Sequence, residues 1–188
     1  MPAHSLSIRL AFPLAAALLL GACSGYSAPS TAGGTAPPKP GATATIANAQ
    51  GEPVGEARFF QTADGIDVEL SARGLPPGEH GAHVHMTGRC DPPGFASAGG
   101  HWNPTAHQHG LKNPQGAHMG DMPNLVIGAD GMGTLRFSLA GGTIEGGANP
   151  LLDADGAAMM IHAGPDDMMS DPAGNSGGRI ACGVIVKH

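Results

Sequence analysis

Short segments in which apolar and polar residues alternate, with turn signals between several of them, most constrain the fold of this chain. Ile66–Leu70 alternates strictly, and the triplet Ala-Asp-Gly occurs at 63–65, 129–131 and 154–156. Outside the first 22 residues, no stretch keeps a helical apolar period over three turns. Regularly spaced short strands are typical of an antiparallel sandwich or barrel. We expect strands at Ala42–Asn48, Gly55–Gln61, Ile66–Leu70, His83–His85, Gly133–Leu139, Ala157–Ile161 and Ile180–Val186.

Two long stretches, Gly88–Gly120 and Ala163–Gly178, interrupt this series, and loops of such length are usually functional. The chain has 31 Gly and 17 Pro, about a quarter of its 188 residues, and few aromatic residues (five Phe, one Trp and one Tyr). Its 41% hydrophobic and 13% charged content argues against disorder. The loops therefore need a source of order other than a large aromatic core.

The N-terminus is interpreted as a targeting segment. Leu10–Leu20 is an apolar run that follows a single base, Arg9, and it is too short to span a bilayer as a helix. The run leads through small residues into Cys23 and resembles a bacterial lipobox, which predicts lipidation of Cys23; an ordinary signal peptide is the alternative. By resemblance to bacterial lipoprotein sorting, Ser24 rather than Asp after the Cys implies the outer membrane. We expect a signal peptide at 1–22, a lipidated Cys and flexible tether at 23–41, and one periplasmic domain at 42–188.

The net charge limits the classes of partner, and the number of cysteines indicates whether a disulfide forms. Fifteen acidic residues against nine basic ones give a net charge of −6, which argues against nucleic acid as a partner. With Cys23 set aside, Cys90 and Cys182 remain as an even pair in an exported protein. This pair predicts one disulfide, with two free thiols as the alternative.

Histidines cluster in and around the two long loops. His83 and His85 stand at i and i+2 of a predicted strand, so their rings share a face. That pair alone is equally compatible with half-exposed strand surface. Three imidazoles and a carboxylate match the ligand set of a tetrahedral Zn²⁺ site. These four residues are His101, His109, His118 and Asp121, and His162 follows a separate apolar run.

Five motifs, in order, resemble the copper/zinc superoxide dismutases, specifically those of the bacterial periplasm. They are Gly78–His85 (GEHGAHVH), Gly99–Pro104 (GGHWNP), His109-Gly110 with Ala117–Asp121 (AHMGD), Ile161–Asp167 (IHAGPDD) and Gly174–Ile185 (GNSGGRIACGVI). The resemblance covers the chain from about residue 42. It implies an eight-stranded antiparallel Greek-key β-barrel with two long functional loops.

The resemblance also implies one copper and one zinc ion per chain. His101 would bridge the two metals, Asp166 would link His83 to His109, Arg179 would lie beside the open copper position, and Cys90 would pair with Cys182. The implied copper ligands are His83, His85, His101 and His162, and the implied zinc ligands are His101, His109, His118 and Asp121.

The implied activity is dismutation of superoxide to dioxygen and hydrogen peroxide, 2 O₂⁻ + 2 H⁺ → O₂ + H₂O₂, with copper alternating between two oxidation states and His101 carrying a proton. A non-enzymatic periplasmic copper/zinc-binding or metal-delivery module on the same fold is the alternative. A copper-only variant is opposed by the intact zinc set. The oligomeric state, monomer or homodimer, stays open.

Other residues near the motifs have less specific interpretations. His80 is expected to be structural, Trp102 to pack, and His107 to be a weaker zinc candidate than His109. Met168 and Met169 are interpreted as loop packing or as soft Cu(I) contacts during loading. The loop before Arg179 has three Asp and no Lys or Arg. Weak steering of an anionic substrate is therefore expected, with Lys112 and Arg89 as the nearest other cations and Ala173 where many relatives have Thr.

Overall fold

The computed structural model describes residues 38–188, so Cys23 and the predicted signal peptide and lipid anchor lie outside the described residues. This part of the chain is almost entirely β-structure, with a single 3₁₀ turn at Ala96–Ala98. None of its helical segments has the length or the apolar character that crossing a membrane requires. The strands are β1 (Ala42–Asn48), β2 (Pro53–Gln61), β3 (Gly65–Arg73), β4 (Gly78–His80), β5 (Ala82–His85), β6 (Leu125–Ile127), β7 (Met132–Ala140), β8 (Ala158–His162), β9 (Arg179–Val184) and β10 (Val186–Lys187).

Each of the seven expected strands is confirmed, with ends that differ by up to three residues. The last expected strand is divided into β9 and β10, because Ile185 lies between two short pairings. The three-residue strands β4 and β6 were not predicted. They pair with each other in a separate two-stranded sheet.

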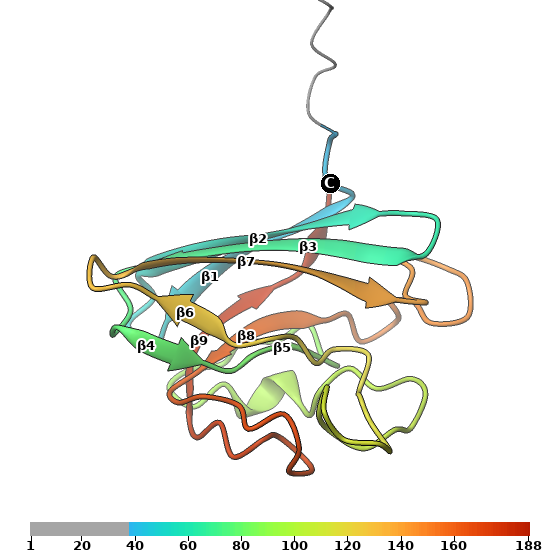
Figure 1. Ribbon diagram of the computed structural model, residues 1–188. Coiled ribbons are helices and arrows are strands. Elements are labelled where there is room, and N and C mark those ends of the chain that lie inside the picture. The colour runs from blue at the N-terminus through green and yellow to red at the C-terminus, as the bar shows by residue number, and fades with distance from the viewer. Residues whose placement is uncertain (1–37) are drawn as a thin grey trace, which may run out of the picture. The chain divides into compact units, whose positions relative to one another are not determined.

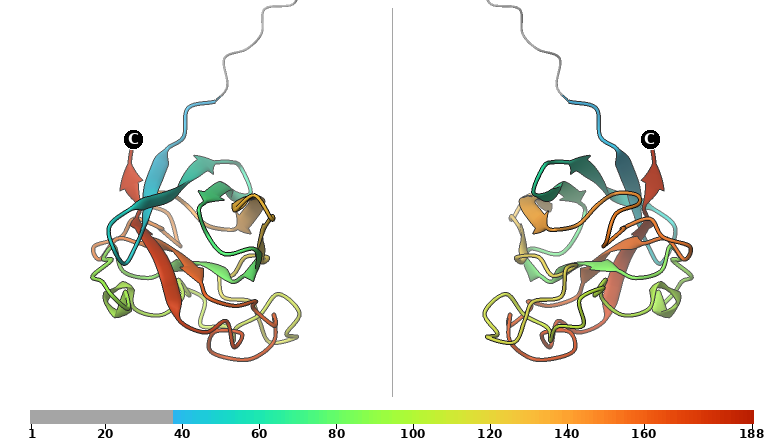
Figure 2. Two further views of the ribbon diagram at one scale, coloured as in Figure 1. Left: turned by 90° about the vertical axis from the view of Figure 1, so that its left-hand side faces the viewer. Right: turned by 90° about the vertical axis from the view of Figure 1, so that its right-hand side faces the viewer.

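The main sheet has eight strands, all paired antiparallel, in the order β5-β8-β9-β1-β2-β3-β7, with β10 also paired to β1. β1, β2 and β3 follow one another as hairpins, and the late strand β9 returns to lie beside β1. This return connection is the Greek-key arrangement. The sheet curls around its core, as the end-on views show (Figure 2), so the predicted fold class is confirmed.

Strand alternation produces the core. In β2 the side chain of Phe59 is fully buried, whereas that of its neighbour Phe60 is partly exposed on the other face. The rest of the core is mostly aliphatic, and Trp102 is its other large aromatic residue. Buried small residues such as Ala44 and Ala57 let the strands pack closely without aromatic bulk.

The two long loops lie together against one side of the barrel, beside β5 and β8 (Figures 1 and 2). The amide of Lys112, in the first loop, donates to the carbonyl of Met168, in the second, at 3.0 Å. Gly110 has a φ of 111°, and a Cβ there would collide with the same carbonyl. The Cys90–Cys182 disulfide ties the first loop to β9, which confirms the predicted pairing.

Candidate metal centre

Strand β5 presents two histidines to the side of the barrel that the two long loops cover. Ala82 and Val84 point into the apolar core, so His83 and His85 point to the opposite face. Both imidazoles are fully buried. The same-face prediction is confirmed, and the half-exposed alternative is excluded.

His101 reaches these rings because its loop is bonded to β5. The amide of Trp102 donates to the carbonyl of Val84 at 2.8 Å, and His101 forms an isolated bridge with His85. The ring of His101 stacks on that of His83, with centroids 4.0 Å apart. A residue 18 positions from His83 in sequence therefore becomes its direct neighbour.

A β-bulge places His162 beside Arg179. The pairing of β8 with β9 shifts register after Ile161, so that His162 pairs with Arg179 and Ile180 has no partner. Bulges commonly redirect side chains next to functional sites. Here the shift brings the candidate ligand and the candidate cation to the same point on adjacent strands.

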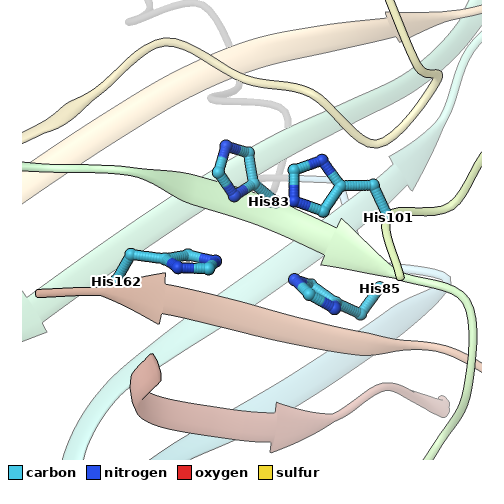
Figure 3. A group of neighbouring side chains, drawn as sticks. All are labelled: His83, His85, His101 and His162. Atoms are coloured by element: carbon cyan, nitrogen blue, oxygen red, sulfur yellow. The ribbon is translucent and has the colours of Figure 1, made fainter. Parts of the chain in front are cut away.

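His83, His85, His101 and His162 form the four-histidine group (Figure 3). Their ligand atoms all lie within 4.8 Å of one another, and none of the residues is more than 8% exposed. Within residues 38–188, one buried nitrogen in each ring has no hydrogen-bond partner, namely Nδ1 of His83 and Nε2 of the other three. Because buried polar atoms are almost always bonded, four such atoms facing a common point indicate a metal.

Hydrogen bonds at the opposite ring nitrogens fix these lone pairs in place. His85 Nδ1 donates to the carbonyl of Gly99 at 2.9 Å, and His162 Nδ1 donates to that of Gly177 at 3.2 Å. His83 Nε2 donates to Asp166 Oδ2 at 2.7 Å. Each bond selects the tautomer that leaves the inward nitrogen free to ligate.

Burial keeps these rings neutral. Desolvation lowers the pKa of His83 to about 3, that of His85 to about 2 and that of His162 to about 4. The charged imidazolium is disfavoured because water is excluded around it. Neutral imidazole is the form that binds metals, so these three rings are ready to ligate near pH 7.

Asp121 gathers three further ring nitrogens. Its Oδ1 lies 2.8 Å from Nδ1 of His101, 3.1 Å from that of His109 and 3.3 Å from that of His118. These four residues form the Asp121 group. Oδ2 accepts the amides of Gly110 at 2.8 Å and His118 at 3.0 Å. Burial raises the pKa of Asp121, but hydrogen bonds from His101 and His109 hold it well below its usual range.

The spacing in the Asp121 group fits a tetrahedral ion. With bonds of about 2.0–2.1 Å to zinc, neighbouring ligand atoms lie roughly 3.3 Å apart. The Nδ1 atoms of His118 and His101 are also 3.3 Å apart. His83 lies within 4.8 Å of His101, His109 and Asp121 as well. Its Nε2 is bound to Asp166, however, and its Nδ1 belongs to the four-histidine group, so His118 is the better fourth ligand.

Asp166 joins the two groups. Its Oδ2 accepts from His83 and its Oδ1 accepts from His109 Nε2 at 3.0 Å. Burial lowers the pKa of His109, but its bonds to Asp121 and Asp166 raise it to about 9. A Cβ at Gly174 would collide with Asp166 Oδ1, so this close packing requires glycine. The predicted link from His83 to His109 is present.

Sequence reasoning missed the residue that holds Asp166. Asn124 Oδ1 accepts the Asp166 amide at 2.8 Å, and Asn124 Nδ2 donates to the Asp166 carbonyl at 3.0 Å. Asn124 is 42 residues away in sequence and belongs to no motif noted above. Only the tertiary contact reveals it.

Arg179 lies in the wall of a cavity of about 630 Å³ above the four-histidine group. Its guanidinium donates to the carbonyls of Phe95 at 2.7 Å and Gly99 at 2.6 Å. The Gly99 carbonyl also accepts from His85, so Arg179 and the candidate ligand His85 are held by the same backbone carbonyl. Burial lowers the pKa of Arg179. His85, His101, His162 and Ala173 line the same cavity.

Among the less specific candidates, two match their structural interpretations. His80 is buried, with Nδ1 2.8 Å from the carbonyl of His162 and Nε2 2.9 Å from that of Pro76. Trp102 is buried in the core, as predicted. His107 is exposed, with Nδ1 3.3 Å from the carbonyl of Ala117, and does not join the Asp121 group.

The methionine that lines the cavity is Met86, and not Met168 or Met169, for which the sequence left a Cu(I) contact open. Met168 and Met169 are absent from the cavity lining, whereas Met86 lines it and is 50% exposed. Its position immediately after His85 was the available signal. Met168 is only 8% exposed, which agrees with loop packing.

A β-barrel with two adjoining histidine-rich groups that share one imidazole is a two-metal protein. The family model described as copper/zinc superoxide dismutase matches residues 54–185. Superoxide dismutase [Cu-Zn] 1 of Aquifex aeolicus is 48% identical over 146 residues, covering 76% of this chain and 85% of that protein. The chain belongs to the copper/zinc superoxide dismutase family.

Solved structures agree with this assignment. An SOD-like protein from Bacillus subtilis matches with 39% identity and a TM-score of 0.73, over 77% of this chain and 97% of that chain. The Cu/Zn superoxide dismutase from Brucella abortus matches with 30% identity and a TM-score of 0.58, over 76% and 97%. The four-histidine group fits copper, and the Asp121 group fits zinc.

Proposed function

We propose that this protein dismutates superoxide to dioxygen and hydrogen peroxide. The observation that carries the proposal is the set of four unpartnered, buried ring nitrogens, because His85, His101 and His162 of this set line one cavity together with Arg179. The four-histidine group would hold copper, and the Asp121 group would hold zinc. Copper supplies a site that alternately accepts and donates one electron, whereas zinc has no redox chemistry.

Arg179 binds and orients the anion. Two carbonyls fix the guanidinium, so it does not need to reorganise when a negative substrate arrives. Its position opposite His162 in the β8–β9 pairing keeps it beside the unpartnered nitrogens. Charge-assisted hydrogen bonds are stronger than neutral ones, which favours superoxide over water at this position.

His101 would carry a proton at Nε2 whenever that nitrogen is not bound to copper. Its Nδ1 is held by Asp121 at 2.8 Å, while Nε2 has no hydrogen-bond partner and the residue lines the cavity. A ring fixed at one nitrogen can take up and release a proton at the other, next to the substrate position. The reaction consumes two protons per peroxide, so this shared imidazole is well placed to deliver one.

The test combines metal analysis with superoxide removal by the purified protein. We expect one copper and one zinc per chain, rapid removal of superoxide, and a loss of about 10²-fold in kcat/KM for Arg179→Ile with both metals retained. Arg89→Ile is the matched control, because Arg89 is paired with Asp91 at 2.7 Å and does not line the cavity.

Three outcomes would contradict the proposal or part of it. Full metal content without activity would favour a non-enzymatic metal-binding module. Copper without zinc in an active protein would favour the copper-only variant. An unchanged kcat/KM in Arg179→Ile would remove the role assigned to that guanidinium.

We also propose that the protein acts in the periplasm, anchored to the outer membrane through lipid on Cys23. The support is the apolar run Leu10–Leu20 followed by small residues and Cys23. A labelled fatty acid should be incorporated into the wild-type protein and not into Cys23→Ala. The variant should then appear in the soluble fraction, and labelling of both forms would contradict the proposal.

A further inference from the structure

The rim of the metal cavity is acidic. Two carboxylates, Asp153 and Asp155, line it, and both residues are exposed. Among the residues that the structure describes, Arg179 is the only Lys or Arg in the lining, and its guanidinium is already bound to two carbonyls. The same cavity contains the unpartnered, buried nitrogens of His85 and His162, which identify it as the route to the site.

The two carboxylates keep their charge uncompensated. Neither forms an ion pair within residues 38–188, whereas Arg89, one of the expected steering cations, is neutralised by Asp91. Asp153 is also fixed in position, because its Oδ1 accepts the amides of Asp155 at 3.0 Å and Gly156 at 3.1 Å. The second expected cation, Lys112, does not line the cavity.

Asp155 belongs to a turn motif that also occurs away from the cavity, so forming the turn does not require a carboxylate at the cavity. The triplet Ala-Asp-Gly forms turns at 63–65, 129–131 and 154–156, and only the last contributes to this lining. Asp130 belongs to the second triplet, where its Oδ1 accepts the amide of Met132 at 3.1 Å. All three triplets therefore form turns, and only the triplet at 154–156 places a carboxylate in the cavity lining.

We propose that Asp153 and Asp155 act as an electrostatic gate that slows the approach of superoxide and favours the entry of metal cations. This inference rests on the proposed function. A field of the substrate's own sign lowers the association rate, and salt screens it. The rate constant for superoxide should therefore rise with ionic strength, the opposite of an enzyme that attracts its anion.

The first experiment measures kcat/KM for superoxide with the metal-loaded protein at ionic strengths of about 0.01 and 0.15 M, where the Debye length falls from roughly 30 to 8 Å. We expect the wild-type value to rise about two- to fivefold with salt. Asp153→Asn/Asp155→Asn should be faster by a similar factor at low salt and nearly insensitive to salt.

Asp67→Asn/Asp130→Asn is the control, because it removes the same charge away from the cavity. Asn retains the acceptor oxygen that bonds Ser138 or Met132. We expect little change in this variant. A wild-type rate that falls with salt, or equal effects in both double variants, would overturn the gate.

Two further readouts separate electrostatics from a structural effect. Asp153→Asn/Asp155→Asn should bind azide more tightly at low salt, as measured by absorbance of the copper-loaded protein. It should also take up Cu²⁺ more slowly into the copper-free, zinc-loaded protein. A structural disturbance would not move an anion and a cation in opposite directions, so changes of the same sign would overturn the proposal. If the wild type removes no superoxide, the proposed function fails, and azide and Cu²⁺ still test the gate.

Discussion

The core of this barrel and its loop-covered side are held together by different forces. In β1, β2 and β3, alternate apolar side chains such as Ile46, Phe59 and Val68 are buried in one core. On the loop-covered side, the buried residues include six histidines of the two metal groups together with Asp121 and Asp166. The first region needs only the exclusion of water, whereas the second needs partners for buried polar atoms.

This difference predicts two kinds of stability in one chain. The apolar core is complete without an ion, since its contacts are between side chains of the sheet. The loop side leaves the four buried ring nitrogens of the four-histidine group without partners within residues 38–188, a cost that bound metals would remove. Metal content should therefore control the loops more strongly than the sheet.

Removal of both metals should give the largest effect. An ion at about 1,000 times its Kd stabilises a fold by roughly 4 kcal/mol, so two ions contribute about 8 kcal/mol. We expect the melting temperature to fall by roughly 15–30 °C on chelation. Hydrogen exchange should accelerate in residues 100–124 and 163–178 before it does in β1–β3. Equal acceleration in both regions would remove the distinction between them.

Truncation of a core side chain should destabilise the sheet and leave metal binding unchanged. Phe59→Ala is expected to lower the free energy of unfolding by about 3–5 kcal/mol, because it leaves a cavity beneath the sheet. Zinc and copper affinities of the folded protein should stay unchanged. Phe60→Ala, on the partly exposed face of the same strand, should cost clearly less in the same denaturant titrations. A loss of metal affinity in Phe59→Ala would show that core and loops are coupled.

The disulfide connects the two regions, and its removal should have the next largest effect. Cys90→Ser/Cys182→Ser should destabilise the fold by about 2–5 kcal/mol, because a closed loop with a sequence separation of 92 residues is opened. The segment with the Phe95 and Gly99 carbonyls that hold Arg179 should lose exchange protection, and kcat/KM should fall. Retained protection of residues 88–100 would contradict this role.

The smallest expected effect belongs to the carboxylate between the metal groups. Asp166→Asn should weaken metal binding about 10- to 100-fold, since it removes the charge that orients His83 and His109. This corresponds to roughly 1.4–2.7 kcal/mol. Asp167→Asn is the matched control, because that exposed neighbour bonds loop amides and no histidine. Competition with a zinc chelator measures both, and equal losses would contradict the role of Asp166.

The sequence was informative wherever a local period or a close motif carried the signal. Strict alternation in Ile66–Leu70 located β3, and the i, i+2 spacing placed His83 and His85 on one face. It was less informative for β4 and β6, whose three-residue pairing is too short to show a period. Asn124 was missed for a related reason, because its contacts with Asp166 span 42 residues.

The sequence by itself determined the all-β class, the faces of the strands and the set of metal-ligating residue types, because these follow from periodicity and side-chain chemistry. Only the tertiary structure decided which ring nitrogen of each histidine is free, that His109 rather than His107 lies beside Asp121, and that Asp153 and Asp155 stand at the cavity. These features depend on distances between segments far apart in the chain, and packing of the barrel and loops sets those distances.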